Sequence, residues 1–348
     1  MTAVAHVVEQ TKTSSKPASF WVDALFVPGV ILALIVYLSS VSDFFLSSGN
    51  LNNLLNQMVL LMLVATGATF VILARELDLS IGAGVALTSV LSASTMAATG
   101  SVIAGLLAGL ACGLTLGLIN GLLVTKLEVP AFVATLGMAV ILRGVALSRT
   151  DGGIVTGLPS GFTTLATGEF LGLSAITWLM IITVGSLVYV QRQTSFGYRV
   201  LAVGGNPEAA RLAGISVTRI KILCFMISGL TIALGGLALM TRTQSGQPNG
   251  AAALELYAVA AIVMGGTSLF GGRGSVTRTI SGVLLIVILQ NGLDLYGVGY
   301  DQQQIVIGLV FIGAATVDFV RRKLDSRAAR RRVRSTLKQA RSAKRVAK

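Results

Sequence analysis

The run "SVIAGLLAGLACGLTLGLINGLLV" at residues 101–124 contains no charged side chain. An apolar stretch of about 20 residues is long enough to cross the hydrocarbon core of a bilayer as an α-helix. A glycine recurs every four residues along this run, at Gly105, Gly109, Gly113, Gly117 and Gly121. Small residues at that spacing share one helix face and allow a second helix to approach closely. The run therefore predicts a tightly packed membrane-spanning helix.

The whole chain has the composition of a membrane protein. Of its 348 residues, 53% are hydrophobic and 12% are charged, whereas soluble domains have about 25% charged residues. Ten apolar runs follow one another, at 22–40, 54–74, 81–98, 101–124, 130–147, 171–190, 220–241, 254–270, 277–293 and 303–320. We therefore expect an all-α polytopic membrane protein with about ten transmembrane helices.

The positions of lysine and arginine predict the orientation. If both ends are inside, the inner side holds 24 of the 27 basic residues, and the outer side holds Arg143, Arg149 and Arg242. Positive charge favours the cytoplasmic side, so both termini are expected in the cytoplasm. The expected parts are a cytoplasmic segment at 1–20, a transmembrane domain at 21–320 and a basic tail at 321–348.

The tail accounts for the net charge of +13, since residues 321–348 carry 13 basic side chains and one acid. A basic segment of this kind binds either nucleic acid or the anionic surface of a membrane. Its position after a membrane domain favours the lipid bilayer, and we expect no nucleic-acid partner.

The sequence offers no set of residues for catalysis. His6 is the single histidine, and Cys112 and Cys224 lie inside separate apolar runs. We therefore expect no catalytic residues, no metal site, no cofactor and no disulfide.

The stretch "MGGTSLFGGRGSVTRTISG" at 264–282 has two interpretations. Glycine-rich loops with basic residues cradle phosphates, but a Walker A loop needs lysine and Ser/Thr directly after the glycines. That pair is missing here. The alternative is a tight cytosolic turn between two spans, built on Gly271, Gly272, Arg273 and Gly274, and we favour it.

A second glycine-interrupted passage, "FVILARELDLSIGAGVALTS", lies at 70–89. Asp78, Ser80 and Gly82 are expected in a cytosolic turn, and Asp78 with Ser80 also fits a helix N-cap. Paired interrupted segments in the two halves of a transporter indicate internal duplication and mark its pathway. The sequence thus predicts a duplication.

The longest inner loop covers residues 191–221 and contains "NPEAARLAG" at 206–214. Proline at the start and glycine at the end predict a short helix. Such a helix is either a docking element on the cytosolic face or a connector on the membrane surface.

Four motifs together resemble the permeases of bacterial ABC importers, in the monosaccharide branch (ribose, xylose, arabinose and galactose). They are "FVILARELDLSIGAG", "LAVGGNPEAARLAGI", "GGTSLFGGRGSV" and the Glu-Ala-Ala-x-x-x-Gly pattern from Glu208 to Gly214. Arg75 and Glu76 depart from the family, which usually has small residues there. The resemblance covers about residues 50–320.

The resemblance implies a transport subunit without enzymatic activity of its own. Its partners would be a separate ABC ATPase, a second permease subunit and a periplasmic sugar-binding protein. The ATPase would be met by the coupling residues Asn206, Glu208, Ala209, Ala210 and Gly214. The alternatives are a secondary sugar transporter, a membrane enzyme, or an ABC permease for a sugar-like signalling molecule.

Neutral polar residues within the runs are candidates for the substrate path. Asn53, Asn56 and Gln57 share one helix face, and Asn120 and Asn291 lie in later spans. Each residue either lines the path of a polyhydroxyl substrate or makes a hydrogen bond between helices.

Overall fold

The computed structural model describes residues 18–299, 301–313 and 316. The predicted basic tail and nearly all of the predicted N-terminal segment lie outside these residues. The chain divides into a unit that ends at Gly297 and a unit that begins at Val298. In the second unit residues 301–313 are helical. The labelled helices and strands all belong to the first unit.

Among the described residues, seven helices are long and apolar enough to cross a membrane, which confirms a helical, multi-pass membrane protein. They are α3 (Ser48–Leu73), α4 (Ile81–Thr99), α5 (Val102–Thr125), α6 (Ala131–Thr150), α8 (Ala175–Gln193), α11 (Val217–Thr243) and α13 (Val276–Leu295). Helix α2 (Ala18–Val41) adds a shorter apolar stretch, Val27–Val41. The predicted total of ten spans is not confirmed.

A small non-helical element precedes α8. The strands β1 (Glu169–Phe170) and β2 (Leu173–Ser174) form an antiparallel hairpin after the short helix α7 (Ser160–Thr167). The expected span from 171 therefore begins at Ala175 instead. Ser174 caps this helix, since its side chain accepts a hydrogen bond from the Thr177 N–H, which satisfies a free donor of the first turn.

The predicted span over 254–270 is wrong in extent, because the helix α12 (Leu254–Met264) has 11 residues. At 1.5 Å per residue it covers about 16 Å, roughly half of the hydrocarbon core. The chain before it runs along α4. The Gln247 N–H donates to Ser89 Oγ at 3.2 Å, and a Cβ at Gly82 would lie 2.5 Å from the Ala251 carbonyl oxygen. Non-helical backbone at membrane depth needs such protein cover.

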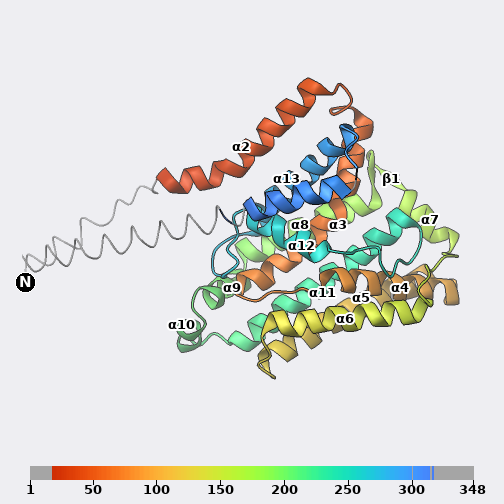
Figure 1. Cartoon of the computed structure of the whole chain (residues 1–348). Coiled ribbons are helices and arrows are strands. Elements are labelled where there is room, and N and C mark those ends of the chain that lie inside the picture. Colours follow the sequence, from red (N-terminus) through yellow and green to blue (C-terminus); the bar gives the residue numbers. More distant parts are fainter. Residues whose placement is uncertain (1–17, 300, 314–315, 317–348) are drawn as a thin grey trace, which may run out of the picture. The chain divides into compact units, whose positions relative to one another are not determined.

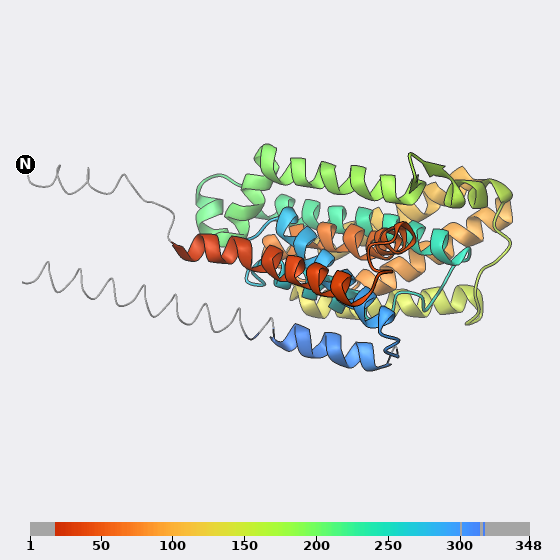
Figure 2. The ribbon, with the colours of Figure 1, turned by 90° about the horizontal axis from the view of Figure 1, so that it is seen from above.

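Helix α11 forms the centre of the bundle. It packs against α3, α4 and α5, and Phe225 and Ile232 are among its fully buried side chains. Helices α6 and α8 run along opposite edges of the bundle (Figure 2). Helix α6 contacts mainly α4 and α5, whereas α8 contacts α3.

The glycine face of α5 packs within the same subunit. A Cβ at Gly109 would overlap the Ser92 side chain of α4, and a Cβ at Gly113 or Gly117 would overlap the backbone of α11. The two helices therefore meet backbone to backbone, as the glycine spacing predicts.

We expect Gly113→Leu to prevent stable assembly of the bundle. Its side chain would collide with the Gly229 carbonyl oxygen, and overpacking of this kind costs about 3 kcal/mol or more where the backbone cannot move. The yield of monodisperse protein after detergent extraction measures the effect. Gly185→Leu is the matched control, because a Cβ there meets nothing within 4 Å. Equal yields of the two variants would refute the expected role of Gly113.

Candidate functional site

The predicted coupling segment is helical and lies at the opposite end of the bundle from α7 and β1 (Figure 1). It consists of α9 (Ser195–Gly205) and α10 (Pro207–Leu212). Asn206 separates them and caps α10, since its Oδ1 accepts hydrogen bonds of 3.1 Å from the Glu208 and Ala209 N–H groups. Proline at the first helical position and the acid after it both favour a helix start. The short helix predicted from the sequence is confirmed.

The residues that α10 exposes differ in part from those predicted to meet the ATPase. Ala210 is 4% exposed and belongs to the hydrophobic core, so its side chain anchors the helix and is not available to a partner. Leu212 is 81% exposed, and sequence reasoning missed it, although a leucine at the end of a polar helix is a detectable signal. Glu208 pairs with Arg211 on the surface, and hydrogen bonding to that carboxylate raises the pKa of Arg211.

The glycine-rich turn 271–274 packs directly onto the coupling segment. The Gly272 N–H donates to the Leu73 carbonyl oxygen at 3.0 Å, and a Cβ on Gly272 would lie 2.6 Å from Gly205 Cα. A Cβ on Gly204 would overlap that same Leu73 oxygen. We call this contact of Leu73, Gly204 and Gly272 the three-backbone junction. It joins the end of α3, the end of α9 and the turn before α13.

Further contacts hold the turn in place. The backbone has positive φ at Gly271, Gly272 and Gly274, a conformation that glycine adopts without steric cost. From α8, Gln191 accepts a hydrogen bond from the Val276 N–H at 3.0 Å and donates to the Gly274 carbonyl at 3.4 Å. The turn predicted from the sequence is therefore confirmed as a turn, and it is built into the bundle.

The other interrupted passage, residues 74–80, is also a turn between two helices, but its polar side chains are buried. Asp78 is 3% exposed. Its Oδ1 accepts a hydrogen bond of 2.6 Å from the Ser80 hydroxyl, and its Oδ2 accepts one of 2.8 Å from Ser228 of α11. Burial raises the pKa of the Asp78 carboxyl, and these hydrogen bonds oppose the rise. Ser80 precedes α4 without capping it through its side chain.

Arg75 and Glu76, which stand where the resembled permeases usually have small residues, have a structural role. Arg75 has a φ of 68°, and a Cβ on Gly271 would lie 2.8 Å from its Cα. Glu76 forms a half-buried ion pair with Lys221 near the start of α11. The passage is thus fixed to the turn 271–274 and to α11.

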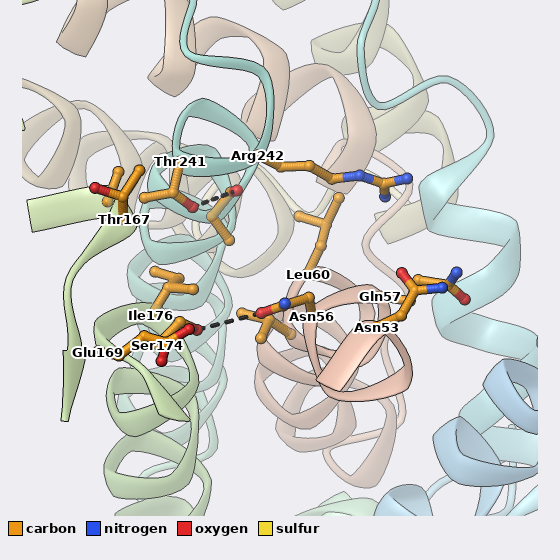
Figure 3. Close-up of a pocket in the computed structure, with 13 residues that line it drawn as sticks. Asn53, Asn56, Gln57, Leu60, Thr167, Glu169, Ser174, Ile176, Thr241 and Arg242 are labelled. Atoms are coloured by element: carbon orange, nitrogen blue, oxygen red, sulfur yellow. Dashed lines mark hydrogen bonds between the residues drawn. The ribbon is translucent and has the colours of Figure 1, made fainter. Parts of the chain in front are cut away.

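Three of the five candidate path residues share one cavity of about 340 Å³ (Figure 3). Asn53, Asn56 and Gln57 reach it from α3, and Asn56 Oδ1 accepts a hydrogen bond of 3.2 Å from the Ser174 hydroxyl. The other polar lining residues come from α7, the hairpin and the end of α11: Thr167, Glu169, Thr241 and Arg242. Most of these groups are amides and hydroxyls, which suit a polyhydroxyl ligand.

Asn120 and Asn291 lie elsewhere and make hydrogen bonds between helices. Asn120 donates to Ser80 Oγ at 2.9 Å. Asn291 of α13 exchanges two hydrogen bonds, of 2.8 and 3.0 Å, with the buried Asn50 of α3. Sequence reasoning missed Asn50, because no local sequence pattern indicates that it will pair with Asn291 of a distant helix.

Within the described part of the chain, no three His, Cys, Asp or Glu side chains lie close enough to hold a metal ion. Cys224 is buried and Cys112 is half-buried, and both are free thiols.

Comparison with known proteins identifies the family of this chain. A family model described as "Branched-chain amino acid transport system / permease component" matches residues 50–315. The ribose import permease of Bacillus subtilis (strain 168) is 42% identical over 290 residues, which cover 83% of this chain and 90% of that protein. The L-arabinose transport system permease of Escherichia coli (strain K12) is 35% identical over 261 residues, 75% of this chain and 80% of that protein.

A "probable ABC transporter permease protein" of Escherichia coli (strain K12) is 39% identical over 301 residues, 86% of this chain and 91% of that protein. No solved structure matches the chain. The family model covers well over half of the sequence, and each of these relatives aligns over three quarters of it or more. This chain belongs to the family of ABC importer permeases.

Proposed function

We propose that the chain is the permease subunit that passes a monosaccharide or similar polyol from a periplasmic binding protein to the cytoplasm. The observation that carries this proposal is the exposed helix α10, which directly follows α9. The three-backbone junction fixes the end of α9 to the end of α3 and to the turn 271–274. A movement imposed on α10 would pass through α9 and thereby reach α3 and α13. The relatives are named as ribose and arabinose permeases, which supports a sugar as the substrate rather than the amino acid in the family description.

The proposed partners are those that membership of the ABC importer permeases implies. A separate ABC ATPase would bind Asn206, Glu208, Ala209, Gly214 and the exposed Leu212, and Ala210 would support them from inside. A second permease subunit would complete the passage, and a periplasmic sugar-binding protein would deliver the substrate. The excess of basic residues on the proposed inner side supports cytoplasmic termini, and the bacterial relatives support a location in the inner membrane of a bacterium.

Two further expectations remain proposals. The cavity with Asn53, Asn56 and Gln57 is proposed as a recess on the outer side that meets the delivered sugar, whereas Asn120 and Asn291 are proposed to hold helices together. An internal duplication is proposed from the two glycine-interrupted passages of the sequence, which meet at Gly271 and Arg75.

A secondary sugar transporter is the second candidate, because Asp78 is a buried carboxyl within the bundle and ion-coupled carriers use such groups. Both oxygens of Asp78 are hydrogen-bonded by serines, which favours a structural role.

Reconstitution in vesicles distinguishes the two candidates. The chain is inserted together with the ATPase and the binding protein encoded beside it, and uptake of ribose, arabinose and leucine is measured. We expect sugar uptake that needs ATP and the binding protein, with no leucine uptake. Sugar uptake driven by an ion gradient without ATP would overturn the proposal.

A further inference from the structure

Arg75 has the backbone conformation of a glycine at the end of α3. Its φ is 68°, a left-handed value that is costly for a residue with a side chain. The Arg75 N–H donates to the Ile72 carbonyl oxygen at 2.9 Å, and the Glu76 N–H donates to the Val71 carbonyl oxygen at 3.0 Å. These two bonds form a Schellman motif, whose left-handed position is usually a glycine. The chain thus keeps a strained arginine here, and such strain is typical of functional positions.

The side chain of Arg75 is exposed and makes no hydrogen bond or ion pair with another described residue. Arg273 is likewise exposed and belongs to neither of the two ion pairs of the described chain. It lies two residues after Gly271, which packs against the Arg75 backbone. The acids Glu76 and Glu208 pair with other cations. Arg75 and Arg273, which we call the arginine patch, therefore leave uncompensated positive charge on the surface.

The arginine patch lies at the centre of one end of the bundle rather than at its rim. Every residue from Leu61 to Ala74 is buried, and α3 contacts α8, α11, α12 and α13. The chain therefore emerges from the middle of the bundle when it reaches Arg75. The three-backbone junction holds the end of α9 at the same place. Lipid headgroups surround a membrane protein at its rim, whereas a protein that binds across this end covers the patch.

We propose that Arg75 is a specificity residue for the ATPase and pairs with a carboxylate on an acidic surface of that partner. The inference rests on the proposed function, in which the ATPase binds the same end of the chain at α10. Arginine holds a carboxylate through two parallel hydrogen bonds, which fix orientation and add affinity. A partner without an acid at this position would leave the guanidinium desolvated and unpaired, which disfavours the wrong ATPase.

This role explains the strain and the charge together. Glycine at position 75 would relax the backbone but would lose the cation, and lysine would keep the charge without the planar fork of donors. Arg273 adds to the positive potential that guides an acidic surface to the patch. The interface then has two parts, because the exposed Leu212 offers apolar surface for burial while Arg75 selects the charge of the partner.

Binding of the ATPase to variants of the full chain tests the proposal. The chain is placed in nanodiscs of phosphatidylcholine, which have no net charge, and its affinity for the ATPase encoded beside it is measured at low and at high salt. We expect Arg75→Gly to bind about tenfold more weakly at low salt, since a charge-assisted hydrogen bond is lost. Its affinity should also depend less on salt. Arg75→Lys should have an intermediate affinity, and Arg75→Glu should bind more weakly than Arg75→Gly.

Two controls separate binding from folding and from net charge. The melting temperature of Arg75→Gly should equal or exceed that of the unmodified chain, because glycine adopts the left-handed conformation without strain, and a lower value would contradict the strain at Arg75. Arg149→Gln removes an exposed arginine from the last turn of α6, away from the arginine patch. It should bind the ATPase as the unmodified chain does.

Three outcomes would count against the proposal. Equal affinity of Arg75→Gly and the unmodified chain would overturn it while leaving the proposed function intact. A loss of affinity that appears only in nanodiscs with phosphatidylglycerol would also overturn it, because the arginine patch would then meet anionic lipid. If the unmodified chain binds no ATPase at all, the proposed function itself is refuted, and this inference with it.

Discussion

A single methyl group at Gly204 is expected to abolish sugar uptake. The Cβ of Gly204→Ala would overlap the Leu73 carbonyl oxygen at the end of α3. That oxygen already accepts a hydrogen bond of 3.0 Å from the Gly272 N–H, so the three backbone segments leave no space for an added methyl group. Either the junction opens or α9 moves away from α3, and a forced overlap of this kind costs about 1–3 kcal/mol or more. The coupling segment would then no longer move with the transmembrane helices.

The next residue supplies the control. A Cβ on Gly205 meets nothing within 4 Å, so Gly205→Ala makes the same chemical change one position along without a collision. ATP-dependent uptake and sugar-stimulated ATP hydrolysis are measured in vesicles for both variants. We expect Gly204→Ala to insert and yet to lose coupling, and Gly205→Ala to behave as the unmodified chain. Normal uptake by Gly204→Ala would refute the role of the junction.

Local sequence patterns were sufficient for the long helices of the fold and for α10. Uninterrupted apolar runs identified the seven spans, because a bilayer-crossing helix needs a continuous apolar stretch. The motif from Asn206 to Gly214 identified α10, since a capping residue, a proline and a glycine each act on the helix turn beside them. The glycine spacing in α5 identified a packing face, although not which helices it meets.

The contacts between distant segments could not be predicted in this way. Leu73, Gly204 and Gly272 are far apart in the sequence, and backbone contacts leave no side-chain pattern. The burial of Ala210 depends on the core beneath α10 rather than on the polar residues around it. The path of residues 244–253 along α4 could not be predicted from hydropathy, because non-helical chain that is covered by protein needs no apolar run.

The second large effect is expected at Leu212. Its side chain is 81% exposed at the end of α10, beside the ion pair of Glu208 with Arg211. An apolar side chain in water gains about 1.5–3 kcal/mol when it is fully buried, and a groove on the ATPase would provide that burial. Leu212→Asp replaces this gain with the cost of desolvating a carboxylate. The change leaves the fold of the membrane domain untouched, because the side chain makes no core contact.

Leu212→Asp is a sharper test than a bulky residue at Gly214. Gly214 has a φ of 79°, so Gly214→Trp would strain the backbone and enlarge the surface at the same time. For Leu212→Asp we expect normal insertion and loss of ATPase binding by about tenfold or more, with a matching loss of uptake. Arg211→Gln is the control, because it removes a surface ion pair worth little. If Leu212→Asp binds the ATPase and transports sugar as well as Arg211→Gln does, the ATPase docks elsewhere on this chain.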